Sequence, residues 1–316
     1  MTVPRIAVLV PCYNEALTVE KVVADFRQAL PGATVYVFDN GSEDDTARLA
    51  RAAGAQVGWV STRGKGHVVR RLFADVEADV YLLVDGDDTY SAGHGPQMVE
   101  RVMAGHDMVV GVRDEAGSGA YRPGHAIGNR VLTAFLAWLF GFTCRDILSG
   151  YRGFSRRFVK SFPGQSSGFE IETELTVHAL ELHMPVAEVT TPYRERPAGS
   201  ASKLNTWRDG FRILRTILVL FTTERPVAFY GTISIALLVL AFVLSVPLLV
   251  TYAQTGLVPR FPTAILTAAL LVLSALSLTV GLILDSVARG RKELRALAYL
   301  RYRAPAGPES ASANGS

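Results

Sequence analysis

Strand-like and helix-like segments alternate regularly over the first 110 residues of this 316-residue chain. The strand-like segments are short, apolar and rich in β-branched residues, and they cover residues 6–10, 34–38, 56–60, 80–84 and 108–111. The helix-like segments between them cover residues 17–30, 45–53, 67–77 and 96–104. Repeated strand–helix units need crossover connections. The sequence therefore predicts an α/β fold with a mainly parallel, doubly wound sheet and helices on both faces.

Three carboxylates follow the fourth predicted strand closely, at Asp85, Asp87 and Asp88. Carboxylates this close repel one another unless a cation lies among them, and Mg²⁺ often bridges a carboxylate to substrate phosphates. The acidic segment falls at the carboxyl end of a strand, where open α/β sheets bind their ligands. A divalent metal site is one interpretation, and a solvated Asp-Gly turn is the other.

Polar loops also follow the first two predicted strands, at residues 11–15 and 39–42. Because parallel strands end at the same edge of a sheet, we expect both loops to lie beside the acidic segment, an arrangement that suits a nucleotide. Some polar residues nearby, such as Thr18 and Asp44, are equally suited to capping helices.

Two long segments near the C-terminus, residues 227–253 and 262–284, carry no charged residue. Each is longer than the roughly 20 residues needed to cross a bilayer, although a buried pair of core helices is the alternative. Arg225 precedes the first segment, and a basic cluster follows the second. The cluster consists of Arg289, Arg291, Lys292 and Arg295. The positive-inside rule then predicts a transmembrane hairpin with both ends on the cytoplasmic side.

The N-terminus runs directly into a predicted strand, with no signal-peptide pattern. We therefore expect a multi-pass protein of the inner or plasma membrane, with a cytoplasmic N-terminal domain. Two cysteines, Cys12 and Cys144, fit a reducing compartment and lack the spacing of a metal site. A formal net charge of only +3 predicts no nucleic-acid partner.

A basic amphipathic helix is predicted just before the hairpin, at residues 206–221, where Arg208, Arg212 and Arg215 recur at helical spacing. Such a helix suits the anionic surface of the cytoplasmic leaflet, and a core helix is the alternative. The apolar segment 127–142 is open to the same two interpretations. The predicted divisions are a cytoplasmic domain at 1–204, a juxtamembrane helix at 205–225, the hairpin at 226–285 and a partly disordered cytoplasmic tail at 286–316.

Four short motifs in order resemble those of the family 2 inverting glycosyltransferases. They are V-P-C-Y-N-E at residues 10–15, D-N-G-S at 39–42 with Asp45 and Thr46, G-K-G at 64–66 and D-G-D at 85–87. A fifth, D-I-L-S-G-Y-R at 146–152, resembles the polyprenyl-phosphate branch, which includes dolichol-phosphate mannose synthase and bacterial polyprenyl-phosphate glucosyltransferases. Residues 199–204 resemble the G-x-S-K segment of that branch with one extra serine. The resemblance covers residues 5–225, and the Q-x-x-R-W motif of processive polysaccharide synthases is absent.

This resemblance implies a GT-A fold and a nucleotide-sugar donor. The residues it assigns to the donor are Pro11, Tyr13, Glu15, Asp39, Asn40, Lys65, Asp85, Glu170 and Glu172. Asp85 and Asp87 would hold Mg²⁺ or Mn²⁺, which neutralises the leaving diphosphate. Asp88 departs from some family members.

The same resemblance implies a polyprenyl phosphate acceptor, whose anionic head needs cations, with arginine favoured for its planar fork. The candidates for the acceptor phosphate are Arg122, Arg130, Arg196 and Lys203. Asp87, Asp146 and Arg152 are the predicted catalytic residues. A phosphate oxygen is already largely ionised near neutral pH, because its second pKa is about 6. Asp146 is therefore either a general base or a residue that orients the acceptor.

We expect, then, a hexosyltransferase of cell-envelope glycan biosynthesis. It would move a hexose from a UDP-glucose-like donor or GDP-mannose to a polyprenyl phosphate in the membrane. Because two-span relatives form oligomers, we also expect a homo-oligomer. One alternative is a related membrane glycosyltransferase with a diacylglycerol, glycan or protein acceptor. The other is a non-catalytic membrane scaffold that binds nucleotide sugars, although a scaffold has no need of the acidic segment.

Overall fold

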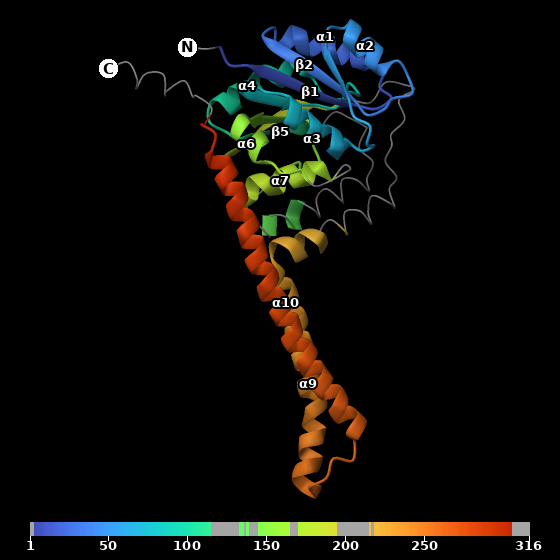
Figure 1. The fold of residues 1–316 in the computed structure, drawn as a ribbon, viewed down its shortest axis with the longest axis vertical. Coiled ribbons are helices and arrows are strands. Elements are labelled where there is room, and N and C mark those ends of the chain that lie inside the picture. The colour runs from blue at the N-terminus through green and yellow to red at the C-terminus, as the bar shows by residue number, and fades with distance from the viewer. Residues whose placement is uncertain are drawn as a thin grey trace, which may run out of the picture. The chain divides into compact units, whose positions relative to one another are not determined.

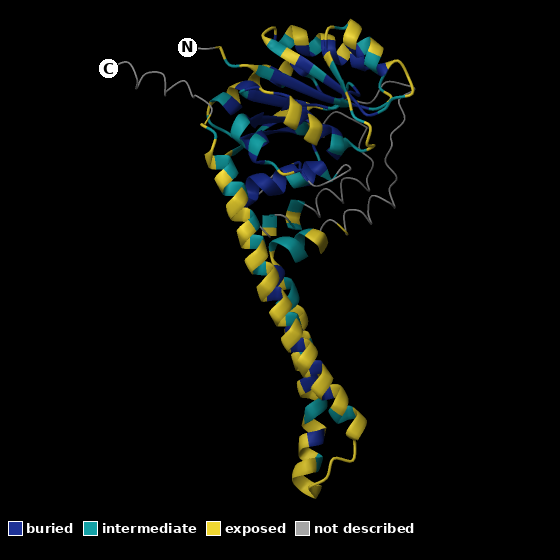
Figure 2. Cartoon of the chain, viewed as in Figure 1, coloured by how far each residue is buried: buried dark blue, intermediate teal, exposed yellow. Residues whose placement is uncertain are grey.

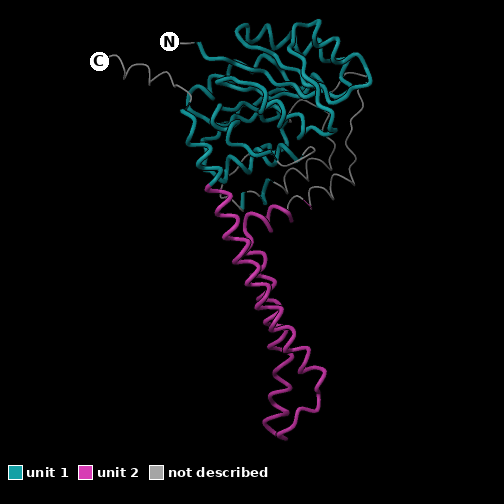
Figure 3. The backbone as a smooth tube through the Cα atoms, in the orientation of Figure 1, with its two compact units in different colours: residues 1–211, 294–316 teal, residues 212–293 magenta. Residues whose placement is uncertain are grey.

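The computed structural model describes residues 3–114, 133–135, 137–138, 145–164, 170–194, 215 and 218–304. The chain divides into two compact units (Figure 3). The first contains residues 1–211 together with residues 294–316, and the second contains residues 212–293. The predicted helices at 127–142 and 206–221 lie largely outside the described residues.

A seven-stranded sheet forms the centre of the first unit (Figure 1). Its strands are β1 (Ile6–Cys12), β2 (Ala33–Asp39), β3 (Gln56–Trp59), β4 (Val80–Leu83), β5 (Met108–Asp114), β6 (Arg152–Ser155) and β7 (Val186–Pro192). They lie in the order β3-β2-β1-β4-β6-β5-β7. Only β6 is antiparallel to its neighbours, β4 and β5. The predicted mainly parallel α/β sheet is confirmed, and each of the five predicted strands is present with its ends within three residues of the prediction.

Helices cover both faces of this sheet. They are α1 (Val19–Ala29), α2 (Thr46–Ala52), α3 (Lys65–Asp75), η1 (Ala92–His94), α4 (Gly95–Met103), α6 (Arg156–Ser161) and α7 (Ile171–Glu181). On one face, α1, α2 and α4 share a core with alternate residues of β1 such as Val8 and Val10. On the other face, Phe73 of α3 contacts Tyr81 and Phe154 edge-on, with ring centroids 6.4 and 5.6 Å apart. Each such aromatic pair adds about 1 kcal/mol to the burial of apolar area.

The second unit contains two long helices, α9 (Pro226–Thr255) and most of α10 (Phe261–Leu300). Both are long and apolar enough to cross a membrane. In their most apolar windows only 11% of α9 and 22% of α10 is buried, so most of their apolar surface is exposed (Figure 2). A core-helix pair in a soluble protein would be mostly buried, so this exposure suggests membrane association instead.

Small and hydroxyl side chains line the contact between these two helices. The hydroxyls of Ser234 and Ser274 lie 3.0 Å apart, and Ser277 donates to the carbonyl of Tyr230 at 2.9 Å. Both patterns are typical of helices that pack in lipid, where close approach and interhelical hydrogen bonds replace the hydrophobic effect. The helix α10 also continues 16 residues beyond residue 284, where the apolar segment ends.

Candidate active site

The loops after β1 and β2 are locked together at the carboxyl edge of the sheet. The amide of Asn14 donates to the hydroxyl of Ser42 at 2.9 Å, and the side-chain oxygen of Asn14 accepts from the amide of Glu43 at 2.9 Å. The amide of Glu15 donates to the hydroxyl of Thr46 at 2.8 Å. Two of the predicted donor-binding motifs therefore form one rigid surface.

Asp39 and Asn40 are neighbours in sequence but have different surroundings. The carboxylate of Asp39 accepts hydrogen bonds from the amide and the hydroxyl of Ser42. The side-chain amide of Asn40 instead donates to the carbonyls of Val60 and Thr62, at 3.1 and 2.7 Å, and its oxygen accepts from the amide of Gly64 at 2.7 Å. Asn40 is buried, and these bonds hold the loop that leads to Lys65, while its assignment to the nucleotide stays a prediction.

A stacked cation lies over the aromatic ring of the first loop. The guanidinium carbon of Arg63 lies 4.1 Å from the centre of the Tyr13 ring, and Arg63 also contacts Glu43 at 3.3 Å. The contact with Tyr13 is the main reason that the pKa of Arg63 is raised above its usual value. The stack fixes the orientation of Tyr13 at the rim of the predicted nucleotide site.

The acidic segment after β4 is held from behind by tight packing. A Cβ atom on Gly86 would lie 2.6 Å from the sulfur of Cys12, so only glycine fits there. The hydroxyl of Thr18 donates to the carbonyl of Gly86 at 2.6 Å. Thr18, considered above as a helix cap, makes no side-chain capping bond to α1 and instead fixes the acidic loop.

The three carboxylates of this segment have separate partners. Asp87 is buried and accepts from the amide and hydroxyl of Thr89, at 3.3 and 2.6 Å. Asp88 has a left-handed backbone, with φ of 58°, and pairs with Lys21 at 2.7 Å. Asp85 pairs with Lys65 at 2.5 Å.

Lys65 joins two predicted donor-site carboxylates into one buried cluster. Its ammonium lies 2.5 Å from Asp85 and 2.6 Å from Glu172. Burial alone would lower the pKa of Lys65, but the two carboxylates outweigh that effect and raise it. The lysine therefore stays charged at neutral pH. Its loop depends on Gly64, whose φ of 129° disfavours residues with a side chain.

Glu172 brings an unsatisfied acceptor into this cluster. Its side chain is 5% exposed, and its second carboxylate oxygen, Oε2, is buried without a hydrogen-bond partner. Burial, together with the charge of Asp85, raises the pKa of Glu172, while Lys65 opposes the rise. Glu170 and Glu174 lie on the opposite, partly exposed side of α7. Such an orphan acceptor costs about 1–3 kcal/mol and suits a hydroxyl donor from a ligand.

The D-I-L-S-G-Y-R segment packs directly against Asp85. A Cβ atom on Gly150 would lie 2.3 Å from Oδ2 of that carboxylate. The amide of Gly150 donates to the hydroxyl of Tyr90 at 2.9 Å, and Ser149 donates to the carbonyl of Gly111 at 2.5 Å. The fifth motif and the acidic segment thus form a single site.

Asp146 is paired with an arginine that the sequence analysis did not single out. Nε and Nη2 of Arg113 donate to the two oxygens of Asp146 at 2.6 and 2.8 Å, and the aspartate side chain is 6% exposed. The guanidinium carbon of Arg113 also lies 5.4 Å from the centre of the Tyr193 ring. Tyr193 in turn contacts Tyr90, with ring centres 5.4 Å apart.

The surroundings of Arg152 give this predicted catalytic residue a structural role. The residue is fully buried on β6. Its guanidinium donates to the backbone carbonyls of Ser149 and Ile147 and to the hydroxyl of Thr176. It does not pair with Asp146. Arg152 therefore holds the 146–152 segment against α7.

The four residues predicted for the acceptor phosphate lie outside the described residues. They are Arg122, Arg130, Arg196 and Lys203. Arg113 could have been found from the sequence as a cation at the end of the fifth predicted strand, on the same edge as the other motifs. Tyr90 and Tyr193 carry no sequence signal of that kind.

The acidic segment has the chemistry that a hard divalent cation needs. Among the residues that the structure describes, no three His, Cys, Asp or Glu side chains are grouped closely enough to hold a metal by themselves. Mg²⁺ and Mn²⁺ sites of nucleotide enzymes need only one or two carboxylates, because substrate phosphates and water complete the coordination. Asp85 and Asp87, two residues apart on a loop fixed by Gly86, fit that requirement.

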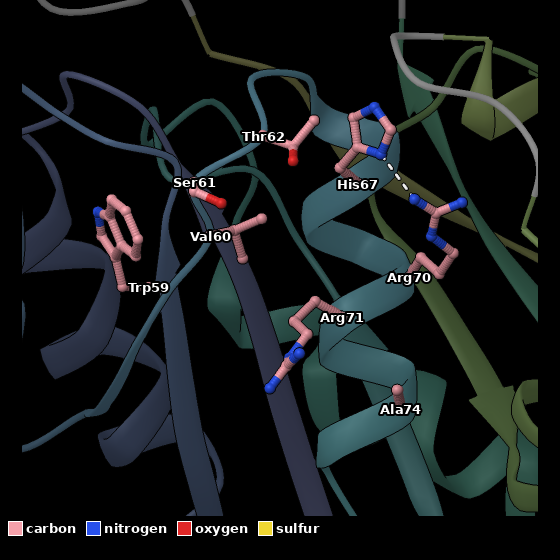
Figure 4. Close-up of a pocket in the computed structure, with 8 residues that line it drawn as sticks. All are labelled: Trp59, Val60, Ser61, Thr62, His67, Arg70, Arg71 and Ala74. Atoms are coloured by element: carbon pink, nitrogen blue, oxygen red, sulfur yellow. Dashed lines mark hydrogen bonds between the residues drawn. The ribbon is translucent and has the colours of Figure 1, made fainter.

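A pocket lies between β3 and α3 (Figure 4). It is lined by Trp59, Val60, Ser61, Thr62, His67, Arg70, Arg71 and Ala74. Its two arginines already have partners: Arg70 contacts Nδ1 of His67 at 2.7 Å, and Arg71 pairs with Asp75 at 2.6 Å. None of the predicted site residues lines it.

Comparisons with known proteins agree with this architecture. The model of glycosyl transferase family 2 matches residues 7–162. Glycosyltransferase AglJ of Haloferax volcanii is 37% identical over 237 residues, which are 74% of this chain and 78% of that protein. Dolichyl-phosphate hexose transferase of the same organism is 29% identical over 71% of this chain and 97% of its own length.

The fold is also that of a solved structure. Glucosyl-3-phosphoglycerate synthase from Mycobacterium tuberculosis, in complex with Mn²⁺, UDP-glucose and phosphoglyceric acid, matches with a TM-score of 0.55 and 24% identity. The match covers 68% of this chain and 79% of that one. The predicted GT-A fold and the predicted resemblance are both confirmed, and the chain is a glycosyltransferase that belongs to glycosyl transferase family 2.

Proposed function

We propose that this protein transfers a hexose from a nucleotide sugar, UDP-glucose-like or GDP-mannose, to a polyprenyl phosphate at the cytoplasmic leaflet. A lipid phosphate oxygen bonds to the anomeric carbon while the bond from that carbon to the diphosphate breaks. Attack from the opposite side inverts the configuration, so an α-linked donor gives a β-linked lipid monophosphosugar.

The observation that carries this proposal is the approach of Gly150 to Asp85. It joins the segment that resembles the polyprenyl-phosphate branch to the acidic segment that suits a nucleotide diphosphate. A donor seated on Asp85 would lie beside the Arg113–Asp146 pair. Both halves of a transfer reaction are then served by one edge of the sheet.

On the donor side, the chain offers rigid groups for each part of a nucleotide sugar. Asp39 and the Tyr13–Arg63 stack lie where the base and ribose would bind, with Pro11 and Glu15 in the first loop. Asp85 and Asp87 would hold Mg²⁺ or Mn²⁺, which when bound neutralises the charge that develops on the leaving diphosphate. Oε2 of Glu172 would accept a hydrogen bond from a sugar hydroxyl, with Lys65 fixing its position.

On the acceptor side, a phosphate needs orientation more than deprotonation, since its second pKa is about 6. We assign Asp146 to orientation, because both its oxygens already accept from Arg113. Arg113 presents a partly exposed cation at the same edge. Arg122, Arg130, Arg196 and Lys203 remain our proposed phosphate ligands.

The relatives support the substrate classes. One bears the name of a dolichyl-phosphate hexose transferase, and the solved structure of the same fold contains Mn²⁺ and UDP-glucose. The apolar α9 and α10 provide a membrane anchor where a lipid acceptor would be found. The basic residues that flank them favour the cytoplasmic side for the catalytic unit.

A donor and acceptor screen tests the proposal directly. Purified full-length protein in detergent is given radiolabelled UDP-glucose or GDP-mannose, Mn²⁺ or Mg²⁺, and undecaprenyl phosphate, diacylglycerol or a glycan as acceptor. We expect a labelled, organic-extractable lipid only with the polyprenyl phosphate. Transfer to diacylglycerol or to a glycan instead would overturn the acceptor assignment.

Two neighbouring aspartates give a matched pair of variants for this assay. Asp87→Ala should abolish transfer, whereas Asp88→Ala should retain most of it because Asp88 is engaged by Lys21 on α1. Full activity of Asp87→Ala would remove the metal assignment.

A further inference from the structure

The last turns of α10 contact the sheet unit through a fully buried carboxylate, that of Asp107. It accepts from the hydroxyl of Ser155 at 2.6 Å and from Nε and Nη2 of Arg157 at 2.5 and 2.6 Å. The fourth donor is the hydroxyl of Tyr299, at 2.7 Å. Tyr299 thus completes the coordination of a charge that lies within the sheet unit.

Three further contacts hold the same stretch of chain. The guanidinium carbon of Arg157 lies 4.7 Å from the centre of the Tyr299 ring, and that of Arg156 lies 5.5 Å from the centre of the Tyr302 ring. Arg295 forms an ion pair with Glu181 in which the two side chains are only 18% and 7% exposed. Partly buried, hydrogen-bonded pairs of this kind contribute more than surface ion pairs do.

Residues 294–302 belong to the sheet unit, although α10 is continuous from residue 261 and passes through the hairpin unit. The chain therefore leaves the sheet unit once, before α9, and returns to it at the end of α10.

The docked residues touch elements that also build the candidate active site. Asp107 immediately precedes β5, whose other end bears Arg113. Glu181 is the last residue of α7, whose first turn bears Glu172. Both elements are thus held at the end away from the candidate site.

We propose that residues 294–302 form a docking segment, a second attachment that sets the position of the catalytic unit relative to the membrane. This rests on the proposed function, since only a membrane acceptor requires such control. A unit held by one connection samples many orientations, and a second connection raises the effective concentration of its active site at the lipid surface. Donor binding, which takes place in solution, does not need it.

The test compares full-length proteins in nanodiscs. A double variant, Tyr299→Phe with Arg295→Gln, removes the hydroxyl and the ion pair but leaves Asp107 paired with Arg157 and Ser155. Hydrogen exchange at residues 107–108 and 299–302 measures docking. Calorimetry with UDP-glucose and Mn²⁺ measures donor affinity, and transfer to undecaprenyl phosphate measures the reaction.

We expect faster exchange in the double variant, a change in donor Kd of less than twofold, and transfer at limiting lipid that is slower by about tenfold or more. Arg301→Gln, at an exposed position beside Tyr299, is the matched control and should resemble the unchanged protein. Unchanged exchange would overturn the docking. Faster exchange with unchanged transfer, or a loss of donor affinity equal to the loss of transfer, would overturn the positioning role.

Failure of the proposed function can be told apart from failure of the docking. If the unchanged protein binds donor but transfers nothing to undecaprenyl phosphate, the proposed acceptor is wrong and the positioning role falls with it. The exchange measurement still decides, in that case, whether residues 294–302 are docked.

Discussion

The α-carbon of Gly150 lies so close to Asp85 that a β-carbon on it would be 2.3 Å from the carboxylate. The obstacle is the carboxylate of Asp85 itself, which is also paired with Lys65 at 2.5 Å. Any residue other than glycine must therefore displace Asp85, the 146–152 segment, or both.

Gly150→Ala should weaken binding of UDP-glucose with Mn²⁺ by tenfold or more and destabilise the protein by about 1–3 kcal/mol, the usual range for overpacking. Calorimetry and thermal unfolding in detergent measure the two effects. Gly32→Ala is the control, since a β-carbon there meets nothing within 4 Å. Equal donor affinity in both variants would show that Asp85 does not bind the donor.

Lys65→Met should destabilise the fold by about 3–5 kcal/mol, because it leaves the buried carboxylate of Glu172 without its cation. The double variant Lys65→Met with Glu172→Met should recover part of that loss. Denaturant unfolding measures both. Lys21→Met provides the comparison: it removes a cation of which half is exposed, so it should cost less than about 1 kcal/mol. A double variant no more stable than Lys65→Met would contradict the pairing.

Asp146→Asn separates a general base from an orienting residue. If Asp146 orients the acceptor, transfer should slow while the rate still rises with pH near 6, where the acceptor phosphate ionises. A general base would instead contribute about 100-fold or more, and its loss would remove its own step from the pH profile.

Arg113→Lys should slow transfer as well, because lysine cannot make the two parallel bonds that Arg113 makes to Asp146. Arg145→Lys is the control, at a nearby arginine whose side chain is 78% exposed. A rate for Arg113→Lys equal to that of the control would remove the positioning role of Arg113.

His178 should make the stability of the protein depend on pH. Burial, with a smaller contribution from the Arg295 cation, lowers the pKa of His178 to about 3. The unfolded chain takes up a proton near pH 6.5 and the folded chain does not, so stability falls as pH falls below 6.5. Between pH 8 and 5 the loss should be about 2 kcal/mol.

Unfolding of His178→Gln should show a smaller slope over this pH range. His106→Gln, at a partly exposed histidine, is the comparison. If both variants have the same slope, another group titrates.

Most strands that the sequence predicted have a continuous apolar run, such as Val80–Leu83, whereas β6 and the polar-interrupted β7 were not predicted. The four residues of β6 escaped prediction because a buried arginine and a glycine interrupt the pattern. The far end of α10 escaped for a related reason. Its charged residues end the hydropathy signal at residue 284, although the helix itself continues to Leu300.

In the candidate site, too, the sequence predicted some features of single residues and not others. The motif order grouped Lys65, Asp85 and Glu172 as predicted donor-site residues, and the structure brings them into contact. Composition alone could not distinguish the two arginines. The guanidinium of Arg152 is buried on β6, whereas that of Arg113 lies at the carboxyl edge of the sheet. That distinction depends on which acceptors surround each guanidinium: backbone carbonyls of the 146–152 segment for Arg152 and the carboxylate of Asp146 for Arg113.

The three hydrogen bonds of Asn40 have a practical meaning for redesign of donor preference. Asp39 and Asn40 form one motif in sequence, but the carboxylate of Asp39 accepts from Ser42 in its own loop, whereas the side chain of Asn40 supports the strand-to-helix turn before Lys65. In a mutational library that varied both positions, most variants would have a disturbed loop before Lys65 and therefore a misplaced Lys65. Diversity is better introduced at position 39, with position 40 kept as asparagine.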